Sequence, residues 1–146
     1  MMQKINIVDD QIKRAPRKSS LDLDVLDWLK VWDAGEVYFD GERKLGYGGY
    51  RYDGRWTKVV DKLIANYELN VNSSLLDVGC AKGYLVNDFN LNPNVGIAVG
   101  VDISAYALIC GTRENIHGTL FCSNATNLPF SDNSFDLVFC KDTLHN

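Results

Sequence analysis

The residues best suited to chemistry lie in two short segments, each at the end of an apolar run. The first segment reads DVGCAKG, from Asp77 to Gly83, and has small residues at positions 79, 81 and 83. Small residues let the backbone turn tightly and let a ligand approach the main chain, and a helix that begins there offers free N–H groups. Taken alone, the same spacing also fits an ordinary turn between a strand and a helix.

The second segment begins at Asp102, and its acidic side chain limits the kinds of ligand that fit. Asp102 follows the apolar run 97–101, 23 residues after Gly79, and a carboxylate there can accept hydrogen bonds from both hydroxyls of a ribose. The first segment has the spacing G-x-A-x-G, one residue tighter than the G-x-G-x-x-G of a dinucleotide site. The pattern therefore favours an adenosine-containing cofactor without a pyrophosphate over a dinucleotide.

The elements that must position these segments alternate between helical and extended patterns. Apolar residues at spacings of three and four predict helices, and short continuous apolar runs predict strands. Asp53 and Ser104 are suited to cap the helices that follow them. The predicted elements are helices at 21–33, 56–67, 83–89 and 105–115 and strands at 75–78, 97–101, 120–122 and 135–140.

Continuous apolar strands that alternate with helices indicate an α/β fold with a doubly wound, Rossmann-like parallel sheet. Ligands bind such sheets at the carboxyl ends of the strands, where both segments lie. We predict an incomplete sheet of about four strands with an N-terminal helical and loop cap. The chain then divides into an N-terminal extension with a Gly- and Tyr-rich cap, 1–55, and a cofactor-binding part, 56–146.

Composition and charge exclude several classes of function. The 146 residues include 15 Lys and Arg against 19 Asp and Glu, and 46% are hydrophobic. The resulting net charge of −4 argues against general binding to nucleic acid or to an anionic membrane, and no apolar run reaches the roughly 18 residues of a transmembrane span. We expect a cytoplasmic protein without a signal peptide, since the N-terminal apolar stretch is short and flanked by acids.

The four cysteines follow no metal-binding or disulfide pattern. Cys80, Cys110, Cys122 and Cys140 form no C-x-x-C pair, and none has a His at metal-ligand spacing. We therefore expect reduced, mostly buried thiols and no bound metal.

Three segments taken together resemble a known enzyme family. LLDVGCAKGYL, VGVDIS and NATNLPFSDNSFDLVF, in this order over 75–146, are similar to the successive motifs of class I S-adenosylmethionine-dependent methyltransferases. The resemblance implies S-adenosyl-L-methionine as cofactor and methyl transfer as activity. It implies cofactor contacts from Asp77, Gly79, Ala81, Gly83, Asp102, Ile103, Asn124 and Ala125. Because nothing in the chain is basic enough for RNA or DNA, we expect a small-molecule acceptor, a metabolite or a sugar-containing molecule.

The resemblance also assigns these residues to parts of the cofactor. The turn after the first strand would line the methionine and ribose, Asp102 would hold the ribose hydroxyls, and Ile103 would pack on the adenine. Asn124 and Ala125 would lie at the adenine edge. Asn124 replaces the Asp common in the family, and its amide oxygen can still accept from the adenine amino group. Ala81 likewise replaces the middle glycine of the turn.

Two further regions are candidates for contact with the acceptor. The segment 35–55, rich in glycine and aromatic residues, is predicted to form a loop or an irregular cap rather than a helix or strand. It resembles the variable N-terminal cap of the family, in which Tyr47 or Arg51 would bind the carboxylate of the methionine moiety or an acidic acceptor. The alternative is a packed aromatic cap that covers the edge of the sheet. After the fourth strand, Asp142 and His145 are candidates for a general base, which is needed only if the acceptor must lose a proton. His145 stands one residue from the C-terminus, where chains fray.

Four strands account for the chain, whereas the family continues with further strands and helices. The strand 135–140 would then form an apolar edge with little helix cover. We therefore predict an N-terminal portion of a longer methyltransferase, with most of the cofactor site and part of the acceptor site. Two rival functions are a non-catalytic module that binds an adenosine cofactor and an NAD-dependent oxidoreductase, which the turn spacing disfavours.

Overall fold

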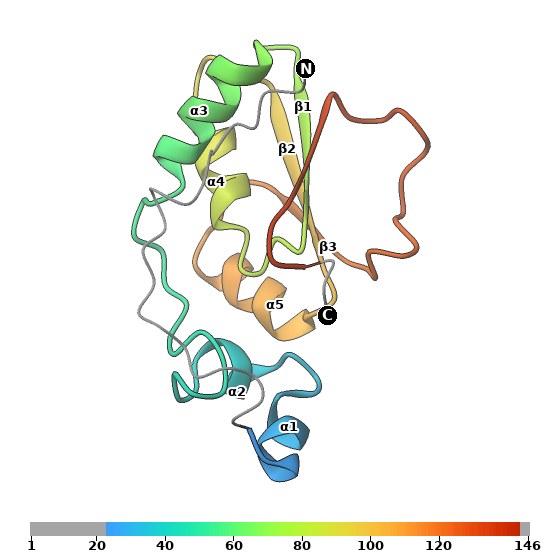
Figure 1. The fold of residues 1–146 in the computed structure, drawn as a ribbon. Coiled ribbons are helices and arrows are strands. Elements are labelled where there is room, and N and C mark those ends of the chain that lie inside the picture. The colour runs from blue at the N-terminus through green and yellow to red at the C-terminus, as the bar shows by residue number, and fades with distance from the viewer. Residues whose placement is uncertain (1–22, 144–146) are drawn as a thin grey trace, which may run out of the picture.

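A four-stranded parallel sheet forms the centre of the structure, a computed structural model that describes residues 23–143. The strand order is β3-β2-β1-β4, so the strand order reverses between β1 and β4 (Figure 1). Each strand lies within two residues of its predicted range, because continuous apolar runs are typical of buried parallel strands. The strands are β1 (Ser74–Val78), β2 (Ile97–Asp102), β3 (Thr119–Cys122) and β4 (Leu137–Cys140).

The strand registers bring the two predicted segments together at one edge of the sheet. Val78 at the end of β1 pairs with Val101 of β2 and with Cys140 of β4. Gly79, just after β1, and Asp102, the last residue of β2, follow these paired residues and therefore lie at the same end of the sheet. The sheet thus has the arrangement in which ligands bind at the carboxyl ends of the strands.

Three helices cover one face of the sheet (Figure 1). They are α3 (Thr57–Tyr67), α4 (Tyr84–Asn90) and α5 (Ala105–Arg113), all close to their predicted ranges. Their apolar side chains pack with β1 and β2 in one core that includes Leu63, Phe89 and Ala107. Among residues 23–143, no helix is long and apolar enough to cross a bilayer.

The opposite face of the sheet carries no helix in the described part of the chain. The connection 123–136, drawn in orange and red in Figure 1, lies over this face, and Phe130 and Phe135 pack in a small cluster against β1 and β2. β4 is an edge strand, and its Val138 is 57% exposed. The predicted open, apolar edge with little helix cover is therefore present.

The N-terminal cap contains two short helices, α1 (Val25–Val31) and α2 (Glu36–Phe39). α1 is shorter than the predicted helix 21–33, of which residues 21 and 22 lie outside the described range, because the side chain of Asp24 caps it by accepting from the N–H of Asp27. Its apolar side chains are not buried, and Trp32 just beyond it is 84% exposed. α2 corrects the prediction that segment 35–55 contains no helix.

An aromatic cluster packs the cap against α4 and α5. The rings of Phe39 and Tyr47 stack with centroids 5.3 Å apart, and Tyr106 of α5 lies 6.5 Å from Phe39. The ring centroid of Tyr50 lies 4.7 Å from that of Tyr47 and 4.8 Å from that of Tyr84 in α4. Burial of Phe39 in this cluster explains why a helical turn forms in a segment whose glycines favour a loop.

One of the two predicted helix caps is wrong. The carboxylate of Asp53 binds the Arg55 side chain, and α3 begins after Trp56 without a side-chain cap. Ser104 caps α5 as predicted, because its hydroxyl accepts from the N–H of Ala107 at 3.1 Å. The N-terminus of α3 lacks the predicted cap because the guanidinium of Arg55, two residues from Asp53, binds both carboxylate oxygens.

All four cysteines are free thiols, but only Cys80 is fully buried. Cys110 is half-buried, and Cys122 and Cys140 are exposed. The prediction of mostly buried thiols is therefore wrong, because the last two residues end β3 and β4 at the two edges of the sheet. Within residues 23–143, no group of His, Cys, Asp and Glu is arranged to hold a metal ion.

Candidate functional site

The turn between β1 and α4 has a backbone shape that requires small residues. Gly79 and Gly83 both have positive φ, +80° and +78°, where glycine is favoured. A Cβ on Gly79 would clash with the side chain of Thr143, and one on Gly83 would lie 2.9 Å from Leu120. The turn is tied to the neighbouring strand, since the N–H of Gly79 donates to the carbonyl of Val101 at 2.8 Å.

A hydrogen bond between Ala81 and Asp102 joins the two predicted segments. The N–H of Ala81 donates to Asp102 Oδ2 at 2.7 Å, and the N–H of Ser104 donates to Oδ1 at 2.8 Å. Ala81 has a φ of +53°, which costs an alanine about 1 kcal/mol, so the contact stabilises a strained residue. A carboxylate has about four acceptor positions, so Asp102 can still accept from a further donor such as a ribose hydroxyl.

A buried carboxyl group, Asp77, and a half-buried one, Asp102, lie at the ends of neighbouring strands. Burial raises the pKa of Asp102, and backbone hydrogen bonds from Ser104 and Ala81 oppose the rise. Burial, and then the negative charge of Asp102, raise the pKa of Asp77 to about 8. Asp77 is therefore mainly protonated at neutral pH, and a cation placed beside it would favour its ionised form.

The residues predicted at the adenine differ in their surroundings. Ile103 follows Asp102 and is 64% exposed, so its side chain is accessible to a flat ring. Ala125 packs in the small cluster on the second face of the sheet. Asn124 forms an Asx turn, in which its Oδ1 accepts from the N–H and the hydroxyl of Thr126, both at 2.9 Å. The Asn124 amide oxygen, predicted to face the adenine, is thus already engaged.

The segment after β4 brings an unpredicted residue to the turn. Thr143 Oγ1 lies 3.3 Å from the carbonyl of Val78. Asp142 is exposed and forms an ion pair with Lys141, and His145 lies outside the described residues. Sequence reasoning missed Thr143, although a polar residue just after a strand's carboxyl end was a usable signal.

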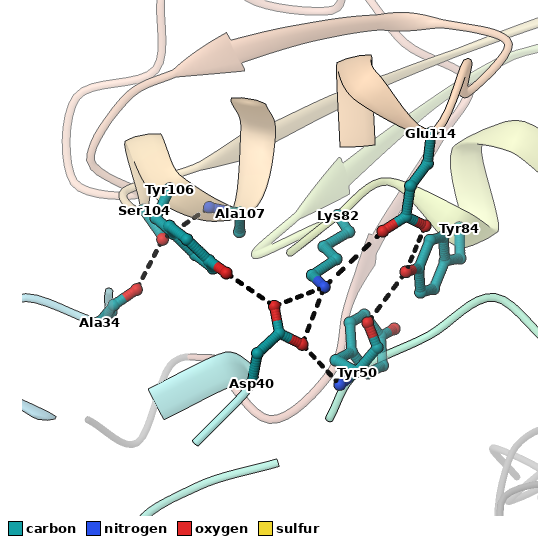
Figure 2. Close-up of polar contacts among 9 residues, drawn as sticks. All are labelled: Ala34, Asp40, Tyr50, Lys82, Tyr84, Ser104, Tyr106, Ala107 and Glu114. Carbon is teal, nitrogen blue, oxygen red and sulfur yellow. Dashed lines mark hydrogen bonds and ion pairs between the residues drawn. The ribbon is translucent and has the colours of Figure 1, made fainter. Parts of the chain in front are cut away.

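The two predicted cap residues lie in different surroundings. Tyr47 packs in the aromatic cluster, whereas Arg51 is exposed and lines an open surface pocket of about 500 Å³. The other pocket-lining residues are Asp40, Tyr52, Lys82, Cys110 and Glu114. In Figure 2, the Lys82 ammonium lies between the carboxylates of Asp40 and Glu114.

Sequence reasoning missed this group of charges. Lys82 stands among the small residues of the turn and is only 3% exposed, and a long charged side chain at such a place was the available signal. Asp40 offered none, since it is one of many acids in the chain and its partner is 42 residues away.

The fold and the site together define the class of protein. A parallel sheet of order β3-β2-β1-β4, with a small-residue turn after β1 and an acid at the end of β2, is a Rossmann-like α/β domain of the kind that binds nucleotide cofactors. Residues 76–146 match a family described as a methyltransferase domain. This part of the chain is similar to that family, and the matched range includes both predicted segments.

Known proteins of different named activities share this domain. The chain is 32% identical over 84 residues to malonyl-[acyl-carrier protein] O-methyltransferase of Marinomonas sp. (strain MWYL1), a match that covers 56% of this chain and 31% of the relative. It is 34% identical over 70 residues to the mitochondrial arginine-hydroxylase NDUFAF5 of Rattus norvegicus, with 48% and 20% covered. The chain thus spans less than a third of the length of either relative.

A solved structure supports the fold. An S-adenosyl-L-methionine-dependent methyltransferase from Methanococcus maripaludis superposes with a TM-score of 0.56 at 14% identity, over 62% of this chain and 43% of that one. At this identity the likeness concerns the arrangement of strands and helices. It agrees with the parallel sheet derived from the sequence pattern, and it leaves the activity to be argued from the residues of the site.

Proposed function

We propose that this chain binds S-adenosyl-L-methionine and forms part of an enzyme that transfers its methyl group to a small-molecule acceptor. The observation that carries the proposal is the 2.7 Å contact between Ala81 and Asp102. A carboxylate with lone pairs to spare then lies beside a tight turn, at the carboxyl ends of adjacent strands. The turn is too short for a pyrophosphate site, which favours adenosine joined to methionine over a dinucleotide.

The residues of the turn would hold the methionine and ribose. Asp102 would accept from the ribose hydroxyls, and Gly79 would let the ligand approach the main chain, because it has no Cβ. Ile103, 64% exposed, offers an apolar surface to the adenine. Asn124 and Ala125 would border the adenine edge. Since Thr126 already occupies the Asn124 oxygen, a contact to the ring nitrogens through the amide N–H₂ fits better.

Asp77 adds a charge argument for a cationic ligand. Its pKa of about 8 arises from burial and from the negative charge of Asp102. A positive group bound nearby, such as the α-ammonium or the sulfonium of S-adenosylmethionine, would stabilise the ionised carboxylate. Binding of that cofactor should therefore release a proton from Asp77 at neutral pH, whereas binding of an uncharged adenosine should release much less.

The bound cofactor supplies an electrophilic methyl group on sulfur. The protein contributes by orienting the acceptor in line with the methyl group and by excluding water. Asp142 is available as a general base for an acceptor that must lose a proton, with His145 as the second candidate. Arg51, exposed at the rim of the surface pocket, is suited to an acidic acceptor.

Two observations favour a longer protein in which the acceptor site is completed. The chain spans 31% of the O-methyltransferase relative. The exposed Val138 on the edge strand β4 leaves apolar surface that a further strand or helix would cover. The four free thiols are compatible with the predicted reducing, cytoplasmic compartment.

Calorimetry with S-adenosylhomocysteine and NAD tests the proposal directly. We expect binding of S-adenosylhomocysteine in the micromolar range and none of NAD. Asp102→Ala should abolish binding of S-adenosylhomocysteine, because the ribose hydroxyls lose their acceptor and the N–H of Ala81 loses its partner. Asp61→Ala, which removes an exposed carboxylate from α3, is the matched control and should bind normally. Binding of NAD alone, or an unchanged Kd for Asp102→Ala, would overturn the proposal.

Turnover separates an enzyme from a binding module. With a labelled methyl donor and a panel of small acceptors, we expect label in at least one acceptor. Cofactor binding without transfer to any acceptor, in a chain extended to the length of the relatives, would support the non-catalytic alternative.

A further inference from the structure

The centre of the cofactor turn is attached to the N-terminal cap by an ion pair between the buried Lys82 and the more exposed Asp40. Lys82 is 3% exposed, and its ammonium lies 3.0 and 2.8 Å from the two carboxylate oxygens of Asp40 (Figure 2). Asp40 directly follows α2 in the cap. An ammonium buried to this degree needs a charged partner, since an unpaired charge there would be strongly destabilising.

Asp40 is itself held from three sides. Besides Lys82, it accepts from the Tyr106 hydroxyl of α5 at 2.8 Å and from the N–H of Tyr50 at 3.2 Å. Burial raises the pKa of Asp40, but the hydrogen bonds from Lys82 and Tyr106 outweigh it and hold the pKa below its usual value. The carboxylate is therefore ionised at neutral pH and fixed in orientation.

A second carboxylate completes the surroundings of the ammonium. Glu114, at the end of α5, lies 3.7 Å from the Lys82 nitrogen. Its other oxygen lies 2.7 Å from the hydroxyl of Tyr84, which also lies 2.9 Å from the carbonyl of Tyr50. The cap, the turn and both ends of α5 thus meet at Lys82.

The position of Lys82 in the turn gives this cluster a consequence for the ligand. The residue before it, Ala81, donates its N–H to Asp102, and the residue after it, Gly83, begins α4 at a positive φ. The backbone of Lys82 is close-packed as well, since a Cβ on Gly111 would clash with its carbonyl oxygen. We therefore expect displacement of the Lys82 side chain to shift the adjacent N–H of Ala81, which binds Asp102.

We propose that Asp40 positions the cofactor-binding turn through Lys82, so that the cap takes part in cofactor binding without touching the ligand. This inference rests on the proposed function of the turn. Asp40 and Lys82 are positioning residues, and the affinity for cofactor depends on their contact through Ala81 and Asp102. By linkage, a bound cofactor that holds the turn also stabilises the cap.

The test measures affinity and stability separately in the full chain. Asp40→Asn, Lys82→Met and the double variant are titrated with S-adenosylhomocysteine, at a temperature at which circular dichroism shows each one folded. We expect each single variant to bind about tenfold more weakly, and the double variant to bind no more weakly than the worse single one, because both remove the same contact. Lys82→Arg keeps the charge and should restore affinity to within about threefold of the wild type.

A milder pair of variants covers the case in which a buried charge change prevents folding. Tyr106→Phe removes one hydroxyl that donates to Asp40, and Tyr67→Phe removes an exposed hydroxyl from α3 as the matched control. We expect two- to threefold weaker binding for the first and no change for the second. Lower melting temperatures with an unchanged Kd in all cap variants would overturn the inference. Failure of the wild type to bind would instead overturn the proposed function, and with it this inference.

Discussion

The turn after β1 and the N-terminal cap differ in what holds them in shape. The turn is held by its own backbone N–H groups, that of Gly79 on the carbonyl of Val101 and that of Ala81 on the carboxylate of Asp102. The cap is held by side chains, above all by the ring of Phe39 and the carboxylate of Asp40. A region whose backbone is tied to a sheet follows from the strand register, whereas a region held by side chains depends on partners distant in sequence.

The largest effect is expected in the cap. Phe39→Ala removes a ring that is 3% exposed and contacts four tyrosines, so it should cost about 3–5 kcal/mol of unfolding free energy. Urea denaturation measures the loss. Trp32→Ala, at an exposed site in the same region, should stay within about 0.5 kcal/mol of the wild type. Equal small effects would mean that the cap shares no core with the sheet.

The turn should resist an added methyl group more than the cap does. Gly83→Ala combines a positive φ with a Cβ 2.9 Å from Leu120, and should cost about 2–4 kcal/mol. Gly54→Ala in the cap has a positive φ but no atom within 4 Å, and should cost about 1 kcal/mol. The difference between the two denaturation midpoints checks the expectation; if it vanishes, the turn is no more tightly packed than the cap.

The buried carboxyl of β1 should make stability depend on pH. The pKa of Asp77 is about 8 in the folded chain, against an ordinary value of 3.8. The folded state therefore keeps a proton that the unfolded state loses, and stability falls as pH rises from about 4 to 8, by at most about 1.4 kcal/mol per pH unit. Denaturation of Asp77→Asn across this range should lack that slope, and Asp61→Asn should keep it. A wild type without the slope would contradict the assignment.

The smallest effect concerns the strained alanine. Ala81→Gly relieves a φ of +53° and should raise stability by up to about 1 kcal/mol, without weakening the N–H bond to Asp102. Thermal denaturation detects the gain as a shift of a few degrees. A loss of stability would mean that the Ala81 methyl group, buried at 6% exposure, contributes more by packing than it costs in strain.

The sheet and the turn could be predicted because their signals are contiguous. Apolar runs located all four strands to within two residues, and small residues at 79, 81 and 83 located the turn. The wrong helix cap reflects competition between neighbours, because Arg55, two residues away, takes the carboxylate of Asp53. Thr126, also two residues away, occupies the Asn124 oxygen, and the place of Asn124 at the adenine stays a prediction. Residue type alone does not rank such partners.

The cap was the least predictable region. Its aromatic residues were visible in the sequence, but two readings, a ligand-binding loop and a packed cap, fitted them equally. Tyr47 stacks on Phe39, in agreement with a packed cap, and Arg51 lies exposed at the pocket. A role of Tyr47 in ligand binding stays a prediction. The role of Arg51 toward an acceptor stays a prediction.

The sequence by itself determined the parallel α/β sheet, the turn and the acid beside it, because each is encoded in residues close together or in the fixed order of strands. Only the tertiary structure decided that Asp40 pairs with Lys82 and that the apolar residues of α1 stay exposed. The physical reason is the distance along the sequence over which each interaction acts. Backbone geometry and hydrophobic periodicity act over a few residues, whereas a buried charge is stabilised by whichever opposite charge the folded chain brings to it, here one 42 residues away.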